Sequence, residues 1–402
     1  MTVSSNFLRG LRANLASWQQ MTEQLTTVRL DEVNQEHLNI IQAVKWGMRF
    51  PQTQLEAVKL ALQASYLSER TGLWQDWLSV LEAIIKKSVH LNDSSLVWQL
   101  YKRQGQLLRL NKQLEAAIIS HCEAEKVVSC LQDPQVLADI YINLSDDYRL
   151  IRRYQEAERY GQQALALLQE NSPEGRLHSI ALLVLGLVAQ ACRQWELAEK
   201  RLREAEAMQR QLGDDEIHLA RILNVLAITL QEQDKLDMAA EYYRQSLAAL
   251  TSTASELDKS QTLNSLGTLY IRLGQYALAE VTFKQADSEA LRRSGDLFTQ
   301  AALTQNIGTA LKEQKRFDEA LLYLRRSQKL WRLLGDELWL ANTLSAVAEL
   351  FTAQGMWQSA VAYYDKALQL VARLPDNVRA QEWQINYLRQ KEQLLAKLAE
   401  EP

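Results

Sequence analysis

Apolar residues recur along this chain at spacings of three and four, which is the period of an amphipathic helix. The clearest unit, residues 264–286, is predicted to form two helices joined by a turn at Gly274. The two packing stripes consist of Leu266, Gly267 and Tyr270 in the first helix, and of Tyr276, Ala279, Phe283 and Ala286 in the second. The unit therefore predicts a helical hairpin.

The same hairpin pattern returns every 40 or 41 residues. The large residues that open the second helix are Trp74, Leu114, Tyr154, Trp195, Leu236, Tyr276, Phe317 and Trp357. Three residues further on stand Ala117, Ala157, Ala198, Ala239, Ala279, Ala320 and Ala360. The first helix carries small residues at Gly105, Ser145, Gly186, Ala227, Gly267, Gly308 and Ala348. Small side chains let two helix backbones cross closely, so we predict a stack of hairpins.

This pattern resembles the tetratricopeptide repeat, whose usual length is about 34 residues. The copies here are longer, as in the long-repeat members of that family. The resemblance implies an all-α fold, a right-handed α-solenoid of about eight hairpins. We expect an N-terminal helical segment over residues 1–52, a repeat array over 53–374 and a C-terminal capping helix over 375–402.

The N-terminal segment is helical by pattern but does not fit the repeat. The run from Glu36 to Trp46, followed by similar positions at 60–62, 70–74 and 81–83, is similar to a linker in bacterial STAND signal-transducing ATPases. In those proteins the linker joins the ATPase module to helical repeats. The resemblance implies a relationship to the sensor arrays of such regulators.

Composition agrees with a folded helical chain, because 47% of the residues are hydrophobic and only 5 of 402 are proline. A net charge of −4 provides no basic field, so we expect neither nucleic acid nor a membrane as a partner. Cys122, Cys130 and Cys192 show no C-x-x-C spacing, and we interpret them as core residues of a cytoplasmic protein. The polar start of the chain does not resemble a signal peptide.

Catalytic motifs are absent from the sequence. No glycine precedes a lysine, which excludes a Walker A loop, and G-x-G-x-x-G, G-x-S-x-G and H-E-x-x-H do not occur. His121 and Cys122 with Glu125 come nearest to a metal site, but His121 falls on a packing position. We therefore expect a non-catalytic protein without a cofactor or a metal.

The first helices are predicted to line the concave groove, where tetratricopeptide arrays usually hold a protein or peptide partner. Asparagine recurs on this face, and its amide can donate to and accept from a peptide backbone. The face also changes from cationic, through mixed charge, to apolar at Ile180, Leu183, Val184 and Leu187. The candidate partner-binding residues are Lys102, Arg103, Arg109, Asn143, Asp146, Arg149, Asn224, Asn264 and Asn306.

Each of these features has a structural alternative. The amides can bond neighbouring helices, the charges can pair between adjacent hairpins, and the apolar residues can pack against the next helix. Function has alternatives as well. The chain could be the sensor region of a STAND-type ATPase or transcription activator, or a regulator similar to the bacterial peptide-pheromone receptors. The oligomeric state stays open.

Overall fold

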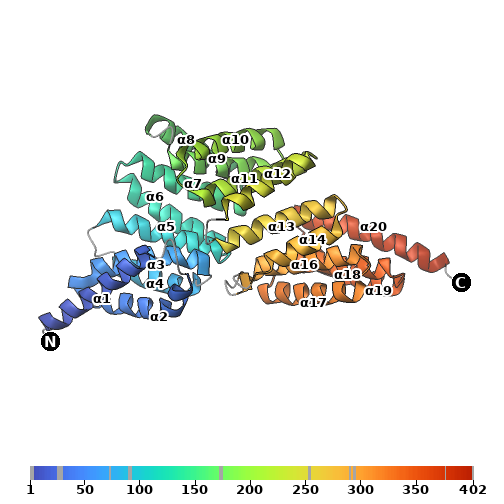
Figure 1. Cartoon of the computed structure of the whole chain (residues 1–402), viewed down its shortest axis with the longest axis horizontal. Coiled ribbons are helices and arrows are strands. Elements are labelled where there is room, and N and C mark those ends of the chain that lie inside the picture. Colours follow the sequence, from blue (N-terminus) through green and yellow to red (C-terminus); the bar gives the residue numbers. More distant parts are fainter. Residues whose placement is uncertain are drawn as a thin grey trace. The chain divides into compact units, whose positions relative to one another are not determined.

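The computed structural model describes residues 4–24, 30–71, 74–88, 93–171, 175–251, 255–288, 291–292, 296–375 and 377–400. The chain divides into two compact units, Met1–Asp258 and Lys259–Pro402. Every regular element within the described ranges is helical (Figure 1). The predicted all-α class is therefore confirmed.

The first unit opens with two helices that precede the repeats, α1 (Ser5–Gln24) and α2 (Leu30–Gly47), and a short 3₁₀ turn, η1 (Pro51–Thr53). Successive hairpins follow. They are α3 (Gln54–Thr71) with α4 (Trp74–Ser88), α5 (Ser94–Leu110) with α6 (Leu114–Ser129), α7 (Pro134–Leu150) with α8 (Tyr154–Asn171), α9 (Arg176–Ala191) with α10 (Trp195–Leu212), and α11 (Glu216–Glu232) with α12 (Leu236–Ala249).

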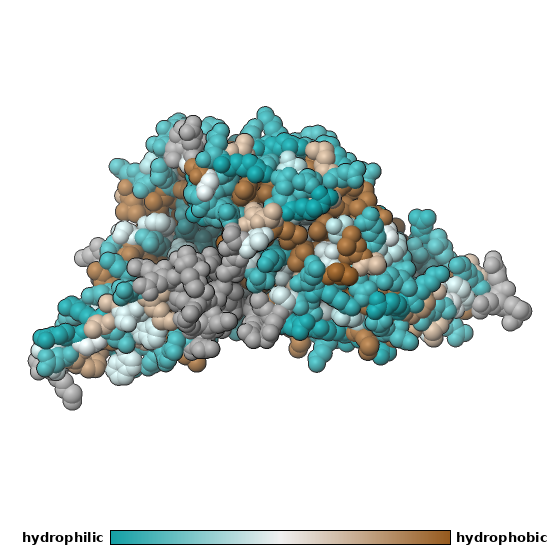
Figure 2. Space-filling model, in the orientation of Figure 1, coloured by the Kyte–Doolittle hydropathy of each residue, from teal (hydrophilic) through white to brown (hydrophobic). Residues whose placement is uncertain are grey.

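The boundary between the units falls near the start of α13 (Glu256–Arg272). The hairpins of the second unit are α13 with α14 (Tyr276–Ala286), α16 (Leu297–Glu313) with α17 (Phe317–Leu334), and α18 (Glu337–Ala353) with α19 (Trp357–Val371). A last helix, α20 (Val378–Glu400), packs on α19, with the Tyr364 and Tyr387 ring centroids 6.1 Å apart. Hydrophilic residues cover most of the surface seen in Figure 2, and hydrophobic ones gather in separate groups. None of the described helices is long and apolar enough to cross a bilayer.

The repeat columns of the sequence correspond to fixed places in the hairpins. Each of the recurring large residues, from Trp74 to Trp357, is the first residue of the second helix of its hairpin. The alanines three residues later are fully buried. Where two helices cross, a Cβ added to Gly267 would lie 2.5 Å from the Phe283 ring. The small residues therefore create the space that a large side chain of the partner helix fills.

The turn inside each hairpin from α5–α6 to α18–α19 contains one residue in the left-handed conformation. Glycine occupies this position at Gly274 (φ +73°) and Gly355 (φ +74°). Other copies place a side chain there, at Lys112, Arg152, Arg193, Asp234 and Lys315. An L-residue is less stable than glycine at a positive φ, so these turns are locally strained.

We expect Arg152→Gly to raise the free energy of unfolding by about 0.5–1 kcal/mol. Glycine removes the steric strain between the Cβ and the backbone at φ +65°. We expect this stabilisation of the folded state to exceed the opposing effect of glycine, which increases the conformational entropy of the unfolded chain. Gly274→Ala should lower the free energy of unfolding by about 1 kcal/mol, for the converse reason. Urea denaturation of both variants tests the pair. Shifts of the same sign would contradict the proposed strain.

Candidate partner-binding site

The candidate residues all lie on the first helices of their hairpins, and we call the surface that these helices present the first-helix face. In the first unit it consists of α5, α7, α9 and α11, and in the second of α13, α16 and α18. Helix α5 carries Lys102, Arg103 and Arg109, α7 carries Asn143, Asp146 and Arg149, α11 carries Asn224, α13 carries Asn264, and α16 carries Asn306.

Charged side chains of α5 and α7 pair with one another. Arg109 Nη1 donates to Asp147 Oδ1 at 3.1 Å and lies 3.3 Å from Asp146 Oδ2. Arg149 donates to Asp146 Oδ1 at 2.6 and 2.9 Å. Burial alone would raise the pKa of Asp146, but the guanidinium groups of Arg149 and Arg109 outweigh it and hold the pKa below its ordinary value. The Asp146 carboxylate therefore stays ionised at neutral pH.

Asn143 joins this network from α7. Its Oδ1 accepts hydrogen bonds from Arg109 Nη2 and Gln106 Nε2, both at 3.3 Å, and its Nδ2 donates to the Asp139 carbonyl at 2.8 Å. The Asp139 carboxylate forms an ion pair with Lys102. Asn143 is only 6% exposed, and its amide connects α7 to α5. This is the packing role that the sequence allowed as an alternative to ligand binding.

A buried histidine–aspartate pair lies behind these charges. His121 Nδ1 hydrogen-bonds to Asp147 Oδ2, and both side chains are fully buried. His121 Nε2 lies 3.2 Å from the Lys102 carbonyl oxygen. Each ring nitrogen of His121 therefore lies within hydrogen-bonding distance of an oxygen atom. Helical spacing places His121 at a packing position, and Gly105 makes room for its ring, but spacing does not reveal the hydrogen bond to Asp147.

Arg103 does not reach the first-helix face, which corrects its predicted role. The side chain is fully buried, and its Nε donates to Ser65 Oγ at 3.1 Å. A second guanidinium nitrogen donates to the Ser65 carbonyl, and the Tyr66 ring centroid lies 4.3 Å from the guanidinium carbon. Helix α3 covers this side of α5, which the periodicity of α5 alone does not reveal. Arg103 therefore joins the two hairpins.

The apolar part of the predicted gradient is packed between helices. Leu183 and Val184 are buried, while Ile180 and Leu187 are half-buried. Helix α9 contacts both α7 and α11, so its apolar residues fill the space between neighbouring first helices. For Leu183 and Val184 the packing alternative therefore describes the structure.

The remaining asparagines have unused hydrogen-bonding capacity. Asn224 is half-buried, and within the described ranges its Oδ1 is buried without a hydrogen-bond donor. Leaving such an oxygen unpaired costs about 1–3 kcal/mol. In the second unit, Asn306 Nδ2 donates to Asn264 Oδ1 at 2.9 Å. This bond orients the two amides along neighbouring first helices.

Four segments of the chain match the tetratricopeptide-repeat family, namely residues 137–171, 177–252, 260–290 and 299–373. Together they cover more than half of the 402 residues. The chain belongs to the tetratricopeptide-repeat family. A sequence search against curated proteins gives no match to this tetratricopeptide-repeat protein.

Several solved structures share the fold of this tetratricopeptide-repeat protein. A Rap protein complexed with competence and sporulation factor has a TM-score of 0.64 at 16% identity, over 92% of this chain and 99% of that chain. The apo quorum sensor NprR from B. thuringiensis has a TM-score of 0.58 at 16% identity, over 91% and 99%. A STAND ATPase with a tetratricopeptide-repeat sensor from Pyrococcus horikoshii has a TM-score of 0.58 at 14% identity, over 89% and 56%. These likenesses show the fold alone.

A second buried histidine lies on α11 beside the first-helix face. His218 Nε2 is 3.2 Å from Ser179 Oγ of α9, and the His218 side chain is buried. Burial lowers its pKa from an ordinary 6.5 to about 4, although the nearby Asp215 carboxylate opposes the shift. His218 is therefore neutral in the folded protein at neutral pH.

We expect the first unit to lose stability as the pH falls from 6.5 toward 4. Above 6.5 this histidine is neutral in both states, and below it the unfolded chain binds a proton that folded His218 does not bind until the pH nears 4. The free energy of unfolding should fall by up to about 3 kcal/mol. Urea denaturation at pH 7 and pH 4.5 should give a smaller pH effect for His218→Gln than for the wild type. An equal effect would rule out His218 as the source.

Proposed function

We propose that this tetratricopeptide-repeat protein is a non-catalytic scaffold or sensor that binds a protein or peptide segment along the concave groove of its first-helix face. The observation that carries the proposal is the series Asn224, Asn264 and Asn306. Among the described residues the Asn224 Oδ1 has no hydrogen-bond donor, and the bond from Asn306 Nδ2 to Asn264 Oδ1 leaves the Asn264 amide nitrogen and the Asn306 amide oxygen as further hydrogen-bonding groups. Such groups suit the backbone of an extended segment.

The charged residues on α5 and α7 favour selectivity over affinity. Lys102, Arg109, Asp146 and Arg149 are each about one-fifth exposed or less, and each is already paired. A ligand whose charges complement these residues gains little binding free energy, because each new ion pair replaces an existing one. A ligand with the opposite charge pattern would separate an existing pair and leave one of its side chains without a counter-ion. We propose that these residues select the charge pattern of the segment that the first unit binds.

The experiment compares captured partners from native cytosol for the wild-type chain and for a triple variant, Asn224→Ala with Asn264→Ala and Asn306→Ala. A matched control changes three exposed glutamines on other helices, Gln163, Gln358 and Gln393, to alanine. We expect partners to be lost from the asparagine variant and kept by the control. Partners kept by both variants would contradict binding through these amides.

Variants confined to one unit separate the contributions of the two units. Asn224→Ala tests the first unit, and the double change of Asn264 and Asn306 tests the second. Loss of a partner in only one of these variants assigns the segment to that unit. Partial losses in both variants would indicate that each unit contributes to the capture of partners.

A sensor role in a signalling system is the second candidate. It is supported by the resemblance of residues 36–83 to the STAND linker and by the fold shared with the P. horikoshii protein. Mass spectrometry of the captured partners distinguishes the possibilities. A P-loop ATPase would favour the STAND-like sensor, and a short secreted peptide would favour a regulator similar to the pheromone receptors.

A further inference from the structure

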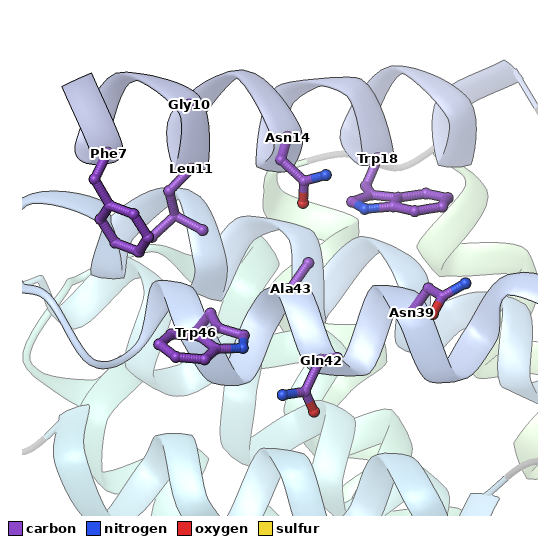
Figure 3. Close-up of a pocket in the computed structure, with 9 residues that line it drawn as sticks. All are labelled: Phe7, Gly10, Leu11, Asn14, Trp18, Asn39, Gln42, Ala43 and Trp46. Atoms are coloured by element: carbon purple, nitrogen blue, oxygen red, sulfur yellow. The ribbon is translucent and has the colours of Figure 1, made fainter.

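The two helices before the repeats leave an open groove between them (Figure 3). Helix α1 lines it with Phe7, Gly10, Leu11 and Trp18, and α2 with Ala43 and Trp46, around a volume of about 570 Å³. Both helices are fixed to α3 on the other side, where Leu15, Gly47 and Ala57 meet. The groove is thus formed by a segment outside the repeat, and the packing of the hairpins does not fill it.

The dimensions of the groove suit a helix. Phe7 and Trp46 lie at one end and Trp18 and Asn39 at the other, so α1 and α2 run antiparallel (Figure 3). From Phe7 to Trp18 helix α1 rises about 16 Å, which is about three helical turns. A Cβ on Gly10 would meet nothing within 4 Å, so the groove has room for side chains of an incoming helix near its Phe7 end.

Large aromatic side chains at one end are only partly covered. Phe7 is 46% exposed and Trp46 is 39% exposed. Burying such rings is a common source of binding energy at protein interfaces, and helices commonly bind by inserting an apolar stripe into a groove of this kind. The exposed amides of Asn14 and Gln42 lie along the same groove and suit the polar border of the stripe.

The aromatic end is also cationic. The Arg49 guanidinium carbon lies 4.3 Å from the Trp46 ring centroid, and Lys45 is exposed beside it. The carboxylate of Glu56 is engaged by Arg12, with Nε and Oε1 3.4 Å apart. Charge complementarity therefore favours an occupant that brings carboxylates to this end.

We propose that the groove between α1 and α2 binds an amphipathic helix of a partner protein, with an apolar stripe of about three turns over Leu11 and Ala43 and acidic residues near Lys45 and Arg49. This site is separate from the first-helix face. The chain can then hold a segment on its repeats and an acidic helix at its N-terminal helices at the same time, which is the arrangement an adaptor requires.

Two fluorescein-labelled peptides of about 14 residues serve as probes. They share one leucine stripe and differ in carrying Glu or Lys at every charged position. Fluorescence polarisation with the full chain should give at least about tenfold tighter binding of the Glu peptide. Equal affinities, or no binding of the Glu peptide, would overturn the proposal.

Variants of α1 and α2 locate the binding. Gly10→Leu adds a side chain at a position where a Cβ meets nothing within 4 Å, and it improves helix propensity, so the chain should fold and lose at least about tenfold in affinity for the Glu peptide. The matched control, Ala16→Leu, adds the same side chain on the opposite face of α1 and should bind as the wild type does. Changing Lys45 and Arg49 together to Glu should reverse the preference toward the Lys peptide. Binding unaffected by Gly10→Leu would overturn the proposal.

Two other outcomes would also overturn the proposal and would identify what happens instead. Loss of the Glu peptide in the triple asparagine variant, but not in Gly10→Leu, would place that peptide on the first-helix face and leave the proposed function intact. A wild-type dimer that becomes a monomer on Gly10→Leu, measured by light scattering, would mean that a second copy of the chain occupies the groove.

Discussion

Ala279→Arg is expected to lower the free energy of unfolding of the second unit by about 4 kcal/mol. Ala279 is fully buried on α14, in the hairpin where Gly267 and Phe283 already meet closely. A guanidinium there needs space that the crossing does not have, and it brings a charge without a partner. Urea denaturation followed by circular dichroism measures the loss.

Leu278→Arg provides the control for this prediction, because Leu278 is the adjacent residue on the same helix and is 45% exposed. The same side chain placed there should change the free energy of unfolding by at most about 0.5 kcal/mol. Similar losses for the two variants would mean that the small-residue column does not mark the helix crossing. A repeat contacts only its neighbours, so the loss should remain in the unit that contains it.

Asp147→Ala is expected to lower the free energy of unfolding of the first unit by about 3–5 kcal/mol. The change removes the carboxylate that His121 and Arg109 share, and it leaves a fully buried imidazole facing a cavity. Removing one member of a buried pair is more destabilising than replacing both members, because the other stays desolvated without a partner.

Asp146→Ala is the matched control for Asp147→Ala. The two residues are neighbours on α7 and both contact Arg109, but Asp146 is about one-fifth exposed and Asp147 is fully buried. We expect a loss of about 1 kcal/mol for Asp146→Ala, since water can reach the arginines it leaves. A double-mutant cycle between His121→Ala and Asp147→Ala should give a coupling energy above about 1 kcal/mol. No coupling would contradict a shared buried pair.

The sequence predicted the hairpins to the residue at one place in each copy, the start of the second helix. The large residues, the alanines three residues later and the small residues of the first helix recur with the same period. They do so because only small side chains fit where two helices cross, and the same crossing is present in every hairpin. The turn before it was harder to recognise. Arg152 has the same left-handed conformation as Gly274, but a long charged side chain gives no signal of a positive φ.

The candidate site depended on contacts that periodicity does not contain. Helical spacing placed Arg103 on the first-helix face, and α3 covers it there. Asp147 did not stand out, although it lies beside Asp146, because its partner His121 is on another helix. The division after Asp258 also had no signal, since the step from Leu236 to Tyr276 is as regular as the others.

The ion pairs between α5 and α7 affect how this array can change in length during evolution. Recombination between similar repeats adds or removes whole hairpins, and ion pairs between other neighbouring hairpins, such as Arg176 with Asp215 and Lys312 with Glu349, keep one member about half exposed. Deleting the hairpin of α5 and α6 would instead remove Lys102, Arg109 and His121 together, and would leave Asp139 and Asp147 without their partners. We therefore expect descendants to gain or lose copies elsewhere and to inherit the hairpins of α5–α6 and α7–α8 as a pair.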